Sequence, residues 1–129
     1  MGYSNYWHQK RSFTDSEWSE IKEYLSRIYE RHHNTISLSE ITDEVLQFNG
    51  QDSQSCEDFT LYKTIREPRY EDDMVELYED DMVEFNFCKT QQHPYDEVVW
   101  KLLKFIKFVV LDPKDKSFSI SNDNGVSYE

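Results

Sequence analysis

The 129-residue sequence contains only three glycines, three prolines and two cysteines. Three glycines cannot form the familiar loops that cradle phosphate groups, and so little glycine and proline argues against a disordered or linker-rich chain. Cys56 and Cys88 are too few for the disulfide framework of a small secreted protein, and they form no C-x-x-C pair. We therefore expect a single domain over residues 1–129 in a reducing cytoplasm.

Basic residues are scarce as well. The chain has 14 Lys and Arg but 26 Asp and Glu, which gives a formal net charge of −12. A surface of this sign repels nucleic-acid phosphates and anionic membranes. The N-terminal residues lack the basic-then-apolar order of a signal peptide, and lysines interrupt the longest apolar run, 98–111. We expect neither direct nucleic-acid binding nor insertion into a membrane.

Aromatic residues make up 16% of the chain and supply much of its apolar content. In residues 3–13 they alternate with polar residues, which predicts a half-buried strand. Tyr3, Asn5, Trp7 and Gln9 should then share one face of this strand.

Two helices are indicated by apolar residues at three-and-four spacing. The first follows a capping box, Thr14 to Glu17, and should run from about Asp15 to His32. The second starts near Pro94, with His93 as its cap, and has lysines on a side that we expect to face water: Lys101, Lys104 and Lys107. Its buried face should consist of Val98, Val99, Leu102, Leu103, Phe105, Ile106 and Val109.

Short alternating segments predict further strands, with a hairpin loop after Asn49-Gly50 that pairs its two flanking strands antiparallel. The pattern predicts an α+β domain, a mostly antiparallel sheet of four to six strands with both amphipathic helices packed on one face. The strand that ends at Cys88 is expected to be central, and the oligomeric state is left open. These segments are 36–38, 45–48, 59–65, 83–88 and 118–120.

An acidic octapeptide, residues 70–77, is repeated almost unchanged as 78–85. The period is too short for a structural repeat array, so we interpret 67–84 as a duplicated acidic insertion. It is either a solvated loop, which could lie loosely over the lysines of the second helix, or a face that blocks a basic partner surface by mimicking nucleic acid. In the second interpretation the partner-binding residues are Glu71, Asp72, Asp73, Glu79, Asp80 and Asp81.

The join between the strand ending at Cys88 and the second helix is the candidate binding site. A lysine, a hydroxyl and the free N–H groups of a helix start can hold a carboxylate or phosphate, and nearby rings could stack on a nucleotide-like ligand. The alternative is that the aromatic residues belong to the core and that Lys89 is merely exposed. The predicted ligand-binding residues are Lys89, Thr90, Tyr95, Asp96, His93, Trp7 and Arg66.

Catalysis and metal binding find little support in the sequence. Cys88 and His93 could be drawn as nucleophile and base, but no third group to orient them is identifiable. The four histidines lack the compact spacing of a zinc site, and the acidic repeat lacks the apolar surroundings that would raise a carboxyl pKa. We therefore predict a non-enzymatic binding protein without catalytic residues, metal or cofactor.

The segment Phe87-Cys88-Lys89-Thr90-x-x-x-Pro94-Tyr95-Asp96, with Phe48-Asn49-Gly50 before it and Asp123-x-Gly125 after it, resembles a family of small bacterial and phage domains that has no assigned activity. The resemblance spans roughly residues 45–125 and departs from the F-C-K-T-x-x-x-P-Y-D pattern at the acidic insertion. A phage origin would imply a role in the host cytoplasm against host defence, by sequestering a small anionic signalling molecule or by blocking a defence protein.

Overall fold

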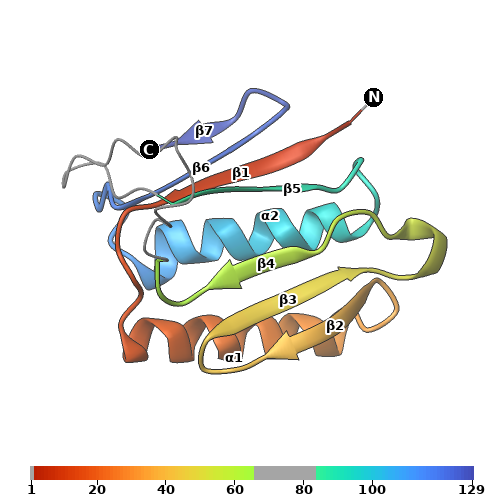
Figure 1. Ribbon diagram of the computed structural model, residues 1–129, viewed down its shortest axis with the longest axis horizontal. Helices are drawn as coiled ribbons and strands as arrows, with labels where there is room; N and C mark the ends of the chain where they lie inside the picture. Colours follow the sequence, from red (N-terminus) through yellow and green to blue (C-terminus); the bar gives the residue numbers. More distant parts are fainter. Residues whose placement is uncertain (1, 66–83) are drawn as a thin grey trace, which may run out of the picture.

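The computed structural model describes residues 2–65 and 84–129 (Figure 1). The acidic insertion, apart from its last residue, and the predicted site residue Arg66 lie outside these ranges. The described elements are β1 (Ser4–Gln9), α1 (Asp15–Arg31), β2 (Ile36–Ile41), β3 (Val45–Gly50), β4 (Phe59–Tyr62), β5 (Glu84–Lys89), α2 (Tyr95–Phe105), β6 (Phe118–Asn122) and β7 (Ser127–Tyr128).

The strands form two antiparallel sheets, one with the order β5-β1-β6-β7 and one with the order β2-β3-β4. The α+β class is confirmed, as is the antiparallel pairing of β3 with β4. Instead of a single sheet of four to six strands, the described residues form seven strands that are divided between the two sheets. The helices α1 and α2 contact each other, and in Figure 1 they run along the sheet of β2, β3 and β4, which crosses the view between them.

The prediction that the strand ending at Cys88 is central is wrong, because β5 is at the edge of the four-stranded sheet. It lies beside β4 of the other sheet, and the backbone N–H of Glu57 donates to the carbonyl of Lys89 at 3.0 Å. The hydrophobic pattern indicates which residues are apolar but not which strands are neighbours. The strand–helix join is therefore also the place where the two sheets meet.

The first half of the chain folds as its local signals predict. Thr14 Oγ1 accepts from the backbone N–H of Glu17 at 3.1 Å, and Glu17 Oε1 accepts from the N–H of Thr14 at 2.9 Å, which completes the capping box. Asn5, Trp7 and Gln9 of β1, with Tyr3 just before it, were predicted to share one face, and all four are buried. The apolar stripe of α1 is buried too, namely Trp18, Ile21, Leu25 and Ile28.

The end of the second helix differs from its prediction. A π-helical turn, Ile106–Val110, follows α2. Lys107 is 1% exposed, and its Nζ donates to the carbonyls of Asp115 and Phe118 at 2.8 Å each, whereas Val109 is 63% exposed. A π turn holds more residues than an α turn, so side chains after it are rotated relative to a 3.6-residue period. The assignments of Lys107 to water and Val109 to the core were therefore wrong.

Candidate functional site

The predicted site at the join, residues 88–96, is called here the strand–helix corner. Some of its polar side chains already form hydrogen bonds within the fold. Thr90 is buried, and its Oγ1 donates to Asp96 Oδ1 at 2.6 Å. Asn5 Nδ2 from β1 donates to the same oxygen at 2.6 Å. The Asp96 carboxylate therefore links the start of α2 to two other segments of the backbone.

Tyr95 is a buried side chain that packs inside the corner. Its side chain is 0% exposed, and its hydroxyl lies 2.7 Å from the carbonyl oxygen of Glu57 and 3.2 Å from that of Lys89. Gly50 leaves room for the ring, because a Cβ built on it would lie 2.8 Å from Tyr95 Cδ1 and 2.3 Å from the carbonyl oxygen of Gln54. Tyr95 thereby holds β3, the segment before β4 and the end of β5 together.

Cys88 lies in the same interior. Its Sγ is 3.5 Å from the carbonyl oxygen of Glu57, and burial raises the pKa of the thiol to about 12. Since the thiolate is the reactive form, a thiol with this pKa is a weak nucleophile at neutral pH. The neighbouring His93 is half-buried, and its Nδ1 has no hydrogen-bond partner in the described part of the chain.

The predicted ligand-binding residues thus face different ways. Lys89 is exposed, whereas Thr90 and Tyr95 point into the protein. Trp7 is 1% exposed and packs in the core against Phe59, with ring centroids 4.9 Å apart. The structure brings Lys89, Thr90, Tyr95 and Asp96 into one corner, but the Thr90 and Tyr95 hydroxyls and one oxygen of Asp96 already form hydrogen bonds inside it. The predicted partner-binding carboxylates of the acidic repeat, and their contact with the second helix, lie outside the described residues.

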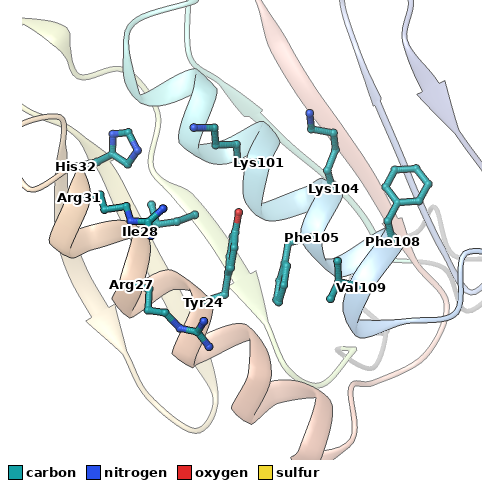
Figure 2. Close-up of a pocket in the computed structure, with 10 residues that line it drawn as sticks. All are labelled: Tyr24, Arg27, Ile28, Arg31, His32, Lys101, Lys104, Phe105, Phe108 and Val109. Atoms are coloured by element: carbon teal, nitrogen blue, oxygen red, sulfur yellow. The ribbon is translucent and has the colours of Figure 1, made fainter.

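A second region, which the sequence did not indicate as a site, is a cavity of about 510 Å³ between α1 and α2 (Figure 2). We call it the α1–α2 groove. Ten described residues line it, five from the α1 side and five from α2 and the π turn, and none of these ten is a carboxylate. Its basic side chains are Arg27, Arg31, His32, Lys101 and Lys104.

Rings form the middle of the groove. Tyr24 and Phe105 stack face to face, with centroids 3.8 Å apart and planes 5° from parallel. Figure 2 shows the two rings standing between the helices, with Ile28 and Arg31 on one side and Val109 and Phe108 on the other. Val109 and Phe108 are both exposed, so the groove has an apolar end as well as a basic one.

Ion pairs neutralise only part of this charge. Arg27 pairs with Glu23 at 2.8 Å and Lys101 with Glu97 at 3.2 Å, each one helical turn away. Arg31 and Lys104 have no salt bridge to any residue in 2–65 or 84–129. Exposed ion pairs such as Arg27–Glu23 and Lys101–Glu97 contribute only about 0–1 kcal/mol each. The Arg27 guanidinium and the Lys101 ammonium can therefore exchange these partners for another anion at little cost.

The residues of this groove follow a pattern in the sequence, but the pattern can be recognised as a site only once the fold is known. Each helix carries two cations about one turn apart beside an aromatic residue. Residues at this spacing lie on one face of a helix. Only the packing of α1 against α2 brings the two faces opposite each other, and the order of the elements along the chain did not determine that contact.

Other candidate sites are weaker. A polar cavity of about 360 Å³ lies beside the loop after β3, lined in part by Ser37, Gln51 and Asp52, and it has no cation among its described lining residues. No cluster of three or more His, Cys, Asp or Glu suited to a metal ion occurs in the ranges that the structure describes. Nor does any helix in those ranges have the length and apolar character needed to span a bilayer.

Comparison of the chain with protein-family models, with curated proteins and with solved structures finds no match. The resemblance to the F-C-K-T-x-x-x-P-Y-D family therefore stays a prediction.

Proposed function

We propose that this chain is a non-enzymatic binding protein that holds a small anionic molecule in the α1–α2 groove. The observation that carries the proposal is the clustering of five basic side chains, without a carboxylate among the described lining residues, in a chain with a net charge of −12. With this net charge, a surface region of average composition would carry more acidic than basic side chains. The basic side chains of the groove should instead produce a local positive potential there, which would attract anions against the average field of the molecule.

The size and chemistry of the groove suit such a ligand. Its volume of about 510 Å³ falls within the range of about 300–1,000 Å³ that is usual for small-molecule sites. A guanidinium such as that of Arg31 can donate two parallel hydrogen bonds to a phosphate or carboxylate, and lysines add mobile point charges. One histidine, without a thiol or carboxylate beside it among the lining residues, lacks the paired groups of nucleophilic catalysis, which favours binding over reaction.

Inorganic pyrophosphate is a suitable first probe, because it presents several charges and no ring. We expect isothermal titration calorimetry at low salt to detect its binding to the wild type, and the double variant Arg31→Ala/Lys104→Ala to weaken it at least tenfold. Lys114→Ala/Lys116→Ala is the matched control, since both lysines are exposed, lie outside the groove, and their loss changes the net charge equally. Its affinity should stay within about twofold of the wild type.

The proposal fails if the wild type shows no pyrophosphate binding at millimolar concentration, or if the two double variants lose affinity equally. Equal loss would mean that the general field, rather than the groove, attracts the anion. The role against host defence remains a prediction from the resemblance, and sequestration of an anionic signal would require the binding proposed here.

A further inference from the structure

We infer that the ligand of the α1–α2 groove is a nucleoside phosphate whose base stacks on Tyr24 while its phosphates lie between Arg31 and the lysines of α2. This inference rests on the proposed function and adds the class of ligand. It starts from the two-part character of the groove, in which cations and exposed apolar side chains line one cavity. An inorganic anion would satisfy only the cations.

Tyr24 is the ring best placed for stacking. Phe105 covers one of its faces in a nearly parallel stack. In Figure 2 the opposite face of Tyr24 is turned toward Ile28 and Arg31, which line the same cavity. A base placed there would extend an existing stack from two rings to three. Because Phe105 already holds the Tyr24 ring in position, little side-chain freedom would be lost on binding.

The charged groups lie where the phosphates of such a ligand would reach. In Figure 2 Arg31 lies to one side of Tyr24, and the Tyr24 hydroxyl points to the side of the groove from which Lys101 and Lys104 extend. No hydrogen bond joins this hydroxyl to another residue within the described ranges. It is therefore available to a ribose or phosphate oxygen between the two lysines.

An acidic helix is a poorer occupant. An α-helix with its side chains is about 10–12 Å across and would need a groove several turns long. The cavity of about 510 Å³ is closer to a nucleotide in size, and its rings are gathered in the middle rather than spread along the two helices.

The experiment compares ligands that share charge but differ in the ring. Titration calorimetry would measure the affinity of the wild type for ADP, GDP and pyrophosphate. Stacking of a base on an aromatic side chain should make at least one nucleotide bind roughly 5- to 150-fold more tightly than pyrophosphate. Tyr24→Leu should remove this preference and leave pyrophosphate binding within about twofold, whereas Tyr24→Phe, which keeps the ring, should retain most of it.

Pyrophosphate binding by Tyr24→Leu also reports that the groove is still folded. If that variant does not fold, nuclear Overhauser contacts between the base protons and the Tyr24 ring in the wild type decide the question, and their absence overturns the inference. Equal wild-type affinity for the nucleotides and pyrophosphate overturns the inference and leaves the proposed function standing. Failure of all three ligands to bind overturns both.

Discussion

The strand–helix corner and the α1–α2 groove both gather polar side chains, but they use them differently. At the corner, Thr90 and Asn5 share one oxygen of Asp96, and Tyr95 is buried against two backbone carbonyls. In the groove, cations project from two helices and have either exposed, easily exchanged partners or no salt bridge within the described residues. A polar motif is therefore a poor indicator of a binding site where its side chains already form hydrogen bonds within the fold.

The residues of the corner that match the F-C-K-T-x-x-x-P-Y-D pattern can be explained by their structural role. Cys88, Thr90, Tyr95 and Asp96 close the junction at which two sheets and the start of α2 meet. Substitutions there should lower stability, and substitutions in the groove should lower affinity. The following predictions test that separation, beginning with the largest expected effect.

Tyr95→Ala should lower the free energy of unfolding by about 3–5 kcal/mol, as removal of a large buried ring leaves a cavity. Tyr95→Phe is the matched variant and should cost only about 0.5–1.5 kcal/mol, because it keeps the ring and loses the hydrogen bond to the Glu57 carbonyl. Urea denaturation measures both. If Tyr95→Ala left the free energy of unfolding nearly unchanged, the structural role of the corner would be contradicted.

Gly50→Ala should destabilise the same junction by about 1–3 kcal/mol. The new methyl group would lie 2.3 Å from the Gln54 carbonyl oxygen and 2.8 Å from Tyr95 Cδ1, so the backbone or the ring has to shift. Ser53, which is exposed on the neighbouring loop, provides a control in Ser53→Ala, expected to change stability by less than about 0.5 kcal/mol. Equal effects of the two substitutions would contradict the close packing of Tyr95 on Gly50.

Lys107 and Lys104 allow the comparison to be made within one helical segment. Lys107→Met leaves the carbonyls of Asp115 and Phe118 without their donor and should cost about 1–3 kcal/mol, whereas Lys104→Met should cost less than about 0.5 kcal/mol. Urea denaturation measures both, and similar losses from the two substitutions would contradict the distinction between the buried Lys107 and the half-buried Lys104.

The pH dependence of stability offers a second measurement on Lys107. Desolvation lowers the pKa of Lys107 in the folded protein, so the unfolded chain binds this proton more tightly. The contribution of Lys107 to the free energy of unfolding should therefore rise with pH between the lowered pKa and the ordinary lysine value of 10.5. The difference in free energy of unfolding between wild type and Lys107→Met should therefore grow as the pH rises through this range, and a difference that does not change with pH would contradict the lowered pKa of Lys107.

Local features of the fold could be predicted because neighbouring residues determine them. The capping box at Thr14 and the alternation on β1 each depend on a few consecutive residues, and both are confirmed. The edge position of β5 and the inward turn of Lys107 could not be predicted in this way. The first depends on pairing between distant strands, and the second depends on a π turn that shifts the helical period.

The candidate site illustrates the same limit. The sequence located a corner rich in polar groups but did not show that Thr90 and Asp96 bind each other. It also placed Lys101 and Lys104 on the outer side of a helix without showing that Arg27 and Arg31 of another helix lie opposite them. Both questions concern contacts between elements, which amphipathic periodicity does not encode.

The central claim is that anions bind at the α1–α2 groove and not at the strand–helix corner, and chemical-shift mapping tests it most directly. Pyrophosphate would be titrated into the ¹⁵N-labelled wild-type protein while amide resonances are followed. The account predicts saturable shifts concentrated in residues 24–32 and 101–109, with little change in residues 88–96. Shifts concentrated at Lys89 to Asp96, with the two helical segments unchanged, would contradict it.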